Sequence, residues 1–241
     1  MNLNLVRSAL NFLHLDLTKN LEYDRLTKAI MKQCIHAQSN CIDIGCHKGE
    51  LLDVILSRSP NGNHFAFEPL PHLFDQLKLK YKGKATIYPY ALSDVTGTST
   101  FQFVKNAPAY SGIHKRQYAL EKPDIEQISV ELKTLDSIIP KDVKIDFIKI
   151  DVEGGEFGVL KGGKQLLLKN KPVIIFESGL GASDYYGTRP NELYQFVVSE
   201  IGLSISTLKS FIKNKPSLTQ KEFEDHFNNN TEYYFIAHSK T

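Results

Sequence analysis

The chain has 241 residues, which is long enough for one α/β domain with a sizeable core and makes two domains unlikely. Its 41% hydrophobic and 23% charged residues are typical of globular proteins, and its net charge of +2 gives no argument for nucleic-acid binding. Three cysteines without zinc spacing or a disulfide framework favour a reducing compartment, and no stretch is long enough to span a bilayer. We therefore expect a cytoplasmic protein, and a homo-oligomer is left open.

The N-terminal region predicts two amphipathic helices, at residues 3–17 and 23–35, because their apolar side chains recur three or four apart. Neither helix carries a recognisable motif. We interpret residues 1–36 as a helical cap on a core formed by residues 37–241, within a single domain.

The first α/β unit lies at residues 41–56, where an apolar run, a loop with Gly45 and Gly49, and a segment of helical spacing follow one another. Open α/β sheets bind ligands beyond the carboxyl ends of their strands, where the strand order reverses. Gly45 has no Cβ, so its backbone can turn sharply and approach a ligand, while Gly49 lets the helix begin close to the strand. The free N–H groups of that helix favour a carboxylate or another anion.

The loop reads Asp-x-Gly-x-x-x-Gly, which differs from the dinucleotide fingerprint Gly-x-Gly-x-x-Gly. Asp43 stands in the place of the first glycine, and its charge would repel a pyrophosphate. A ligand with an ammonium group and no phosphate suits the loop better, and S-adenosyl-L-methionine (SAM) has both properties.

The alternation of strands and helices continues along the chain. We expect further strands at residues 64–69, 85–92, 145–151, 173–177, 203–208 and 233–237. Helices are expected at residues 71–81, 134–139, 156–168 and 192–201. Residues 98–104 and 127–132 alternate polar and apolar side chains around a long loop, which indicates an antiparallel excursion before the strand at 145–151. The whole pattern predicts one doubly wound α/β domain.

Acidic residues stand at or near the ends of four of these strands: Asp43, Glu68, Asp151 and Glu177. Four acids on one rim of a sheet point to a shared site. Glu68 follows Asp43 at about the distance at which an acid meets a ribose, and its two oxygens can accept hydrogen bonds from both hydroxyls.

Several blocks resemble the FkbM family of SAM-dependent methyltransferases, over roughly residues 40–180. They are Ile42-Asp43-Ile44-Gly45-x-x-x-Gly49, Phe67-Glu68-Pro69, Ala91-Leu92-Ser93-Asp94 and Phe147-Ile148-Lys149-Ile150-Asp151-Val152-Glu153-Gly154. The resemblance implies a Rossmann-like class I methyltransferase fold, a mostly parallel seven-stranded sheet of order 3-2-1-4-5-7-6 with helices on both faces.

The resemblance also implies roles for the residues of the site. The loop from Asp43 through Gly45 and Cys46 to Gly49 would hold the methionine part of SAM. Glu68 with Pro69 would hold the ribose, Ser93 with Asp94 would lie at the adenine edge, and Asp151 would lie beside the sulfonium. Family members more often carry Ala-Asn where this chain has Cys46-His47, so side-chain contacts there are open.

Transfer of a methyl group to a hydroxyl needs in-line positioning and a base for the hydroxyl proton. Asp151 and Glu153 are the candidate bases. The alternative for Asp151 is that it only binds the cofactor ammonium or caps a helix. Asp151, Glu153 and Glu177 have the oxygen ligands of a divalent-cation site, but we expect no metal. Lys149 is expected to pair with a neighbouring acid.

We therefore predict O-methylation of a hydroxyl on a sugar, glycan or secondary metabolite, with the substrate class taken from the resemblance. The alternatives are an inactive SAM-binding module and, less favoured because the first glycine is missing, a nucleotide-dependent dehydrogenase.

Overall fold

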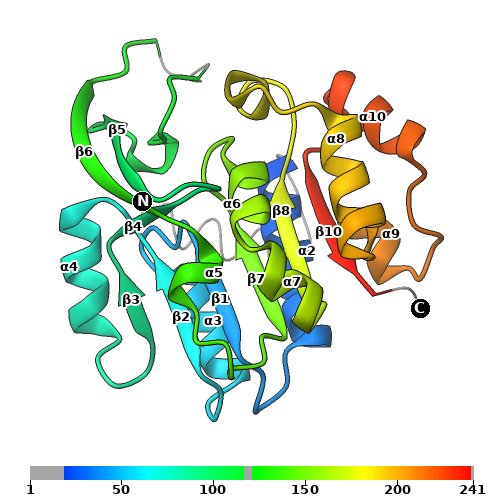
Figure 1. Ribbon diagram of the computed structural model, residues 1–241, viewed down its shortest axis with the longest axis horizontal. Helices are drawn as coiled ribbons and strands as arrows, with labels where there is room; N and C mark the ends of the chain where they lie inside the picture. Colours follow the sequence, from blue (N-terminus) through cyan, green and yellow to red (C-terminus); the bar gives the residue numbers. More distant parts are fainter. Residues whose placement is uncertain (1–18, 117–120, 240–241) are drawn as a thin grey trace.

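The computed structural model describes residues 19–116 and 121–239, and a seven-stranded sheet forms its centre (Figure 1). The strand order is β3-β2-β1-β7-β8-β10-β9, which in chain order of these strands is the expected 3-2-1-4-5-7-6. The first five are parallel, and β10 is antiparallel to both of its neighbours. The strands are β1 (Cys41–Ile44), β2 (His64–Phe67), β3 (Thr86–Tyr88), β7 (Phe147–Ile150), β8 (Val173–Glu177), β9 (Ser204–Thr207) and β10 (Tyr234–His238).

Helices cover both faces of the sheet. One face packs against α2 (Lys19–Cys34), α3 (Glu50–Arg58), α4 (Pro71–Lys80) and α9 (Leu208–Ile212). The other packs against α5 (Leu135–Ile138), α6 (Glu156–Gly162), α7 (Lys164–Asn170), α8 (Pro190–Gln195) and α10 (Gln220–Asn228). In the described part of the chain, no helix is both long enough and apolar enough to cross a membrane.

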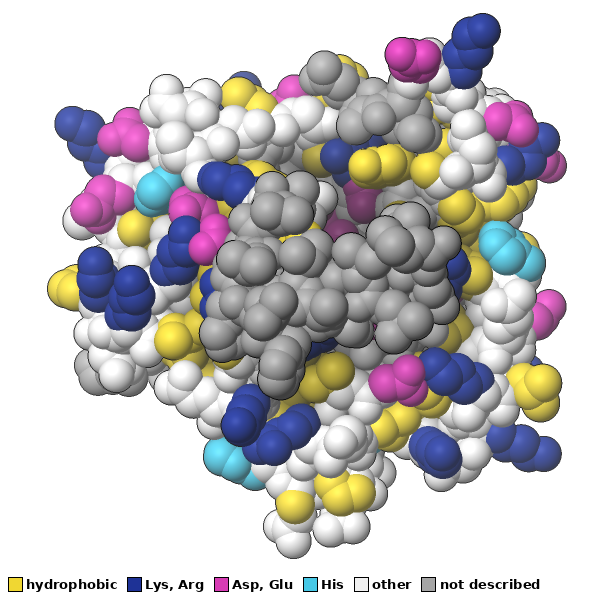
Figure 2. Space-filling view, turned by 180° about the vertical axis from the view of Figure 1, so that it is seen from behind, with side chains coloured by type: hydrophobic (Ala, Val, Ile, Leu, Met, Phe, Trp, Pro, Cys, Tyr) yellow, Lys and Arg dark blue, Asp and Glu magenta, His cyan; other side chains and the backbone are white. Residues whose placement is uncertain are grey.

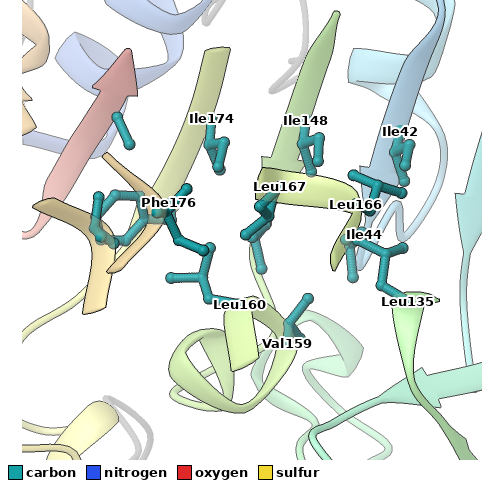
Figure 3. Close-up of a cluster of buried hydrophobic side chains, with 14 of the residues drawn as sticks. Ile42, Ile44, Leu135, Ile148, Val159, Leu160, Leu166, Leu167, Ile174 and Phe176 are labelled. Atoms are coloured by element: carbon teal, nitrogen blue, oxygen red, sulfur yellow. The ribbon is translucent and has the colours of Figure 1, made fainter. Parts of the chain in front are cut away.

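The core on the second face follows from the alternation of side chains along the strands. Ile42 and Ile44 of β1, Ile148 of β7, and Ile174 and Phe176 of β8 point to this face and are almost completely buried. Figure 3 shows them against leucine and valine side chains of α5, α6 and α7. Apolar burial of this kind supplies most of the folding free energy, at about 25 cal/mol per Å², and it holds β1 and β7 side by side.

The prediction of one strand at residues 85–92 is wrong in one respect, because the structure divides this segment into two strands at Pro89. β3 ends at Tyr88, and β4 (Tyr90–Leu92) joins a second sheet of order β4-β6-β5. Proline has no N–H for the ladder of the main sheet, so the chain leaves that sheet there. The second sheet, with β5 (Gly97–Val104) antiparallel to β6 (Ile125–Lys133), is the predicted excursion.

The helices differ from expectation at three points, and one expected helix is not tested. The helix expected at 3–17 lies outside the described residues. The helix expected at 156–168 is divided into α6 and α7 at Gly163, and the one expected at 192–201 begins at Pro190 and continues beyond α8 as a π-helical segment, η3 (Phe196–Ile201). The sequence reasoning missed α9 and α10, although Thr219 and Glu222 form a capping box, a local signal for the start of α10.

Candidate active site

Strand register places two of the four acids, with Lys149 and Tyr234, on one face of the sheet, the face covered by α2. Asp43 of β1 lies opposite Lys149 of β7, and Glu177 of β8 lies opposite Tyr234 of β10. Their alternating neighbours belong to the core beneath α2, so these four side chains point the same way. Glu68 and Asp151 follow directly on β2 and β7.

Lys149 is the centre of a buried charge network. Its Nζ lies 3.7 Å from Asp43 Oδ1 and 3.4 Å from Asp151 Oδ2, and it donates a hydrogen bond of 3.1 Å to the carbonyl oxygen of Gly45. Burial lowers the pKa of Lys149, but the charges of Asp151 and Asp43 outweigh it and hold that pKa above its ordinary value. The expected pairing of Lys149 with neighbouring acids is confirmed.

Asp43 is completely buried, and it lines neither of the two cavities described below. Its two carboxylate oxygens have no hydrogen-bond partner in the described residues. The ion pair with Lys149 is therefore the main interaction that offsets the cost of burying this charge. Burial raises the pKa of Asp43 and Lys149 lowers it. In the structure Asp43 pairs with Lys149, and the expected contact of Asp43 with the cofactor stays a prediction.

The two loop glycines are required by backbone conformation and by close packing. Gly45 has φ +72°, and a Cβ there would lie 1.8 Å from the carbonyl oxygen of Asp151. Gly49 has φ +78°, and a Cβ there would lie 2.3 Å from the Tyr81 hydroxyl. Gly45 lines the first cavity, while Gly49 and the buried Cys46 do not.

The first cavity lies beyond the ends of β1 and β2, with Glu68 and Pro69 in its wall. Glu68 accepts hydrogen bonds from the backbone N–H groups of His47 at 2.9 Å and Leu70 at 3.0 Å. Burial raises the pKa of Glu68 to about 7, although these two N–H groups lower it. Each carboxylate oxygen keeps a lone pair, so Glu68 can still accept two hydroxyl donors.

Apolar side chains make up the rest of the first cavity, whose volume is about 60 Å³. Pro108, Ala109, Ser111 and Ile113 close it from the side of the excursion. The remaining apolar lining comes from Ile44, Phe67, Leu70, Tyr90, Ala91, Leu92, Phe101 and Val152.

Ser93 and Asp94, the expected adenine contacts, line a groove next to the first cavity and not the cavity itself. Leu92 lines both, so the two spaces are neighbours at that residue. Asp94 forms an ion pair of 2.5 Å with Lys161, and this hydrogen-bonded partner lowers the pKa of Asp94. Contact of Ser93 and Asp94 with an adenine stays a prediction.

A second, larger cavity of about 520 Å³ adjoins the first. Asp151, Glu153 and Ala109 line both, so the cavities meet at these residues. On the face shown in Figure 2, acidic side chains lie recessed in a hollow, with apolar side chains along part of its edge. The lining includes four tyrosines, four acids and two cations: Tyr23, Tyr110, Tyr233, Tyr234, Asp24, Asp151, Glu153, Glu177, Arg116 and Lys149.

The acids at this junction form a close group. One oxygen each of Asp151, Glu153 and Glu177 lies within 4.8 Å of the others, a spacing that a divalent cation could bridge. Two protein cations already neutralise part of the charge of this group, because Arg116 pairs with Glu153 and Lys149 pairs with Asp151. We therefore assign no metal to the site, and the expectation of a metal-free site stays a prediction.

The turn after β7 is held by a residue that sequence reasoning missed. Glu153 has φ +61°, an unusual conformation for a non-glycine residue. The buried Glu156 accepts hydrogen bonds from the N–H groups of Val152 and Gly154, which stabilises this turn. Burial raises the pKa of Glu156 to about 7. No local motif marks Glu156, nor Arg116 and Tyr234, as part of the site.

The fold and this site define an α/β protein of the class I methyltransferase type. The chain belongs to the FkbM methyltransferase family, because the family model described as Methyltransferase FkbM domain matches residues 43–203. The resemblance noted in the sequence is thus confirmed.

A solved structure of the same family agrees on the fold. An FkbM methyltransferase from Methylobacillus flagellatus KT matches with a TM-score of 0.52 and 15% identity, over 85% of this chain and 44% of that chain. This chain thus spans less than half the length of that relative. A precorrin-6y C5,15-methyltransferase from Geobacter metallireducens GS-15 has a TM-score of 0.43 and 16% identity, over 76% and 72% of the two chains. No curated protein matches the chain.

Proposed function

We propose that the protein transfers a methyl group from SAM to a hydroxyl of a sugar, glycan or secondary metabolite. The observation that carries the proposal is the pair of cavities that meet at Asp151 and Glu153. One has the features of a nucleoside pocket, and the other is a polar space next to it. We treat the chain as one methyltransferase domain.

The chain's residues fit SAM at the first cavity. Glu68 has one free lone pair on each oxygen for the ribose hydroxyls, with Pro69 beside it. The backbone of the loop from Gly45 to Gly49 and the carboxylate of Asp151 would hold the methionine part. Asp43 and Cys46 are buried and Gly49 packs closely on Tyr81, so these three residues support the conformation of that loop. Ser93 with Asp94 would border the adenine. SAM, when bound, supplies an electrophilic methyl group.

The second cavity supports a polyhydroxylated acceptor. Tyrosine rings offer flat apolar surfaces with a polar tip, and carboxylates accept hydrogen bonds from hydroxyl groups. Asp24, Asp151, Glu153 and Glu177 would repel phosphate groups, so we propose a small-molecule or glycan acceptor and no nucleic acid.

Asp151 and Glu153 are the residues that we propose at the reacting centre, since they border both cavities. Their main contribution is positioning, because methyl transfer is an in-line displacement and depends on how acceptor and methyl group are held. We also propose a cytoplasmic location, supported by the three free thiols, Cys34, Cys41 and Cys46.

Incubation with methyl-labelled SAM and a panel of acceptors tests the proposal. The panel contains methyl glycosides of glucose, mannose and rhamnose, together with simple phenols. We expect label on a hydroxyl oxygen of at least one class, and none with Asp151→Asn at limiting SAM. SAM binding without transfer to any acceptor would favour the binding module instead.

A further inference from the structure

Three carboxylates meet at the junction of the cavities, and their partners differ. Asp151 Oδ2 accepts a hydrogen bond of 2.8 Å from the Tyr234 hydroxyl and lies 3.4 Å from Lys149. Glu153 forms an ion pair with Arg116. Within residues 19–116 and 121–239, the Glu177 carboxylate has no hydrogen bond or ion pair.

We propose that Glu177 is the base that takes the proton from the acceptor hydroxyl, an inference that rests on the proposed function. Glu177 lines the second cavity and not the first, so it faces the acceptor and not the cofactor. Its carboxylate oxygen lies within 4.8 Å of those of Asp151 and Glu153, the two acids that border both cavities. It is therefore placed beside the junction where the methyl group passes.

Asp151 and Glu153 are poorer bases than Glu177 for a physical reason. Hydrogen-bond donors and cations stabilise a carboxylate in its ionised form and so weaken it as a proton acceptor. Tyr234 and Lys149 act in this way on Asp151, and Arg116 acts in this way on Glu153. In the described residues, Glu177 has no hydrogen-bond donor and no ion-pair partner, and Arg116 and Lys149 act on it only from a greater distance.

The proton and electron changes balance. The acceptor oxygen forms its bond to the methyl carbon while the carbon–sulfur bond breaks, and that electron pair stays on sulfur. The O–H bond breaks with its proton going to Glu177. The products are a methyl ether, S-adenosylhomocysteine (SAH) and a protonated carboxyl group, which later returns its proton to water.

The surroundings of Glu177 link its charge to the cofactor. Burial, followed by the charges of Asp151 and Glu156, raises the pKa of Glu177 well above its usual value, while Arg116 and Lys149 lower it. A cationic sulfonium near the junction adds positive charge and favours the ionised form. The titratable and charged groups around Glu177 are Asp151 and Lys149 of the β7 segment, Glu153 and Glu156 of the following turn and helix, Arg116 of the excursion, and Tyr233 and Tyr234 of the β10 segment.

Titration calorimetry in two buffers with different heats of ionisation measures the protons released on ligand binding. We expect the wild-type protein to release more protons with SAM than with SAH, by up to about one proton. Glu177→Gln should abolish this difference, and Glu153→Gln should retain it. The same proton count in wild type and Glu177→Gln would overturn the proposal. If neither SAM nor SAH binds the wild type, the proposed function itself is wrong.

A kinetic test separates the base from a structural residue. With the best acceptor of the panel, Glu177→Gln should lower kcat by about 10²–10⁴ and change the KM for SAM by less than about twofold. Asp151→Asn should mainly raise that KM. Glu177→Asp keeps the carboxylate and should recover part of kcat with a shifted pH profile, which also covers the case of a poorly folded Gln variant. A kcat for Glu177→Gln within tenfold of wild type would contradict the assignment.

Discussion

At the scale of single residues, Lys149 connects the folding of the sheet to the geometry of the site. It is 6% exposed and links β1 to the end of β7 through Asp43 and Asp151. A buried ion pair adds little net stability compared with an apolar pair, but removal of one partner leaves a buried charge without compensation.

Lys149→Met should therefore lower the free energy of unfolding by about 3–5 kcal/mol, measured by urea unfolding at neutral pH. The double variant Asp43→Asn/Lys149→Met removes both charges, so it should lose clearly less than Lys149→Met alone. Equal losses in the two variants would show that Asp43 does not depend on Lys149.

Glu68 should make SAM binding depend on pH. Burial raises the pKa of Glu68 from 4.5 to about 7, so below about pH 7 the ligand-free protein holds this carboxyl neutral. The dissociation constant for SAM should then rise as the pH falls from about 8 to about 6, since a charged acceptor binds hydroxyls more strongly. Glu68→Gln should bind about tenfold or more weakly at the higher pH and lose this pH dependence.

The raised pKa of Glu68 also affects the stability of the ligand-free protein. The folded state holds its proton more tightly than the unfolded state, so the stability that Glu68 contributes is fully present below about pH 4.5. This contribution to stability is lost as the pH rises towards about 7.

For SAM binding, an affinity of the wild type that is independent of pH would show that Glu68 does not reach the ribose.

At the scale of elements, the excursion between β4 and β6 forms a wall of the first cavity. Its residues Pro108, Ala109, Ser111 and Ile113 leave a volume of about 60 Å³, whereas small-molecule sites usually measure about 300–1,000 Å³. We therefore expect this wall to move outward when a nucleoside-sized ligand enters.

We expect hydrogen exchange to report this movement. Amides of residues 105–113 should gain protection when SAM and an acceptor are both bound, because the closed wall then packs on the ligands. Amides of α10, which lie away from both cavities, provide the internal control. Equal exchange at residues 105–113 with and without ligands would make the excursion a static part of the fold.

At the scale of the whole molecule, ligand specificity should appear as a change in thermal stability. SAM and SAH should each stabilise the folded protein, by about 2.7 kcal/mol at a concentration 100 times the dissociation constant. NAD should leave the melting temperature unchanged, since Asp43 replaces the first glycine of the dinucleotide loop and the site holds several acids. A shift with NAD and none with SAM would reverse the assignment of the cofactor.

The doubly wound sheet and the acids at its rim could be predicted from local patterns in the sequence. Apolar runs such as 41–44 and 147–150 predict buried strands, and the acids that end or follow strands are visible in the same local pattern. Sequence order then places these acids at one edge, because consecutive parallel strands end on the same side.

Which of these acids line a cavity, and which partners they have, depends on tertiary contacts that no local pattern shows. Tyr234 meets Asp151 across 83 residues of sequence, and Arg116 meets Glu153 from the loop between β5 and β6. Asp43, the first acid of the loop, is enclosed behind Lys149 and lines neither cavity. The reason is physical: a strand pattern specifies the face on which a side chain lies, whereas its burial and its charge partner depend on register with strands and loops far away in the chain.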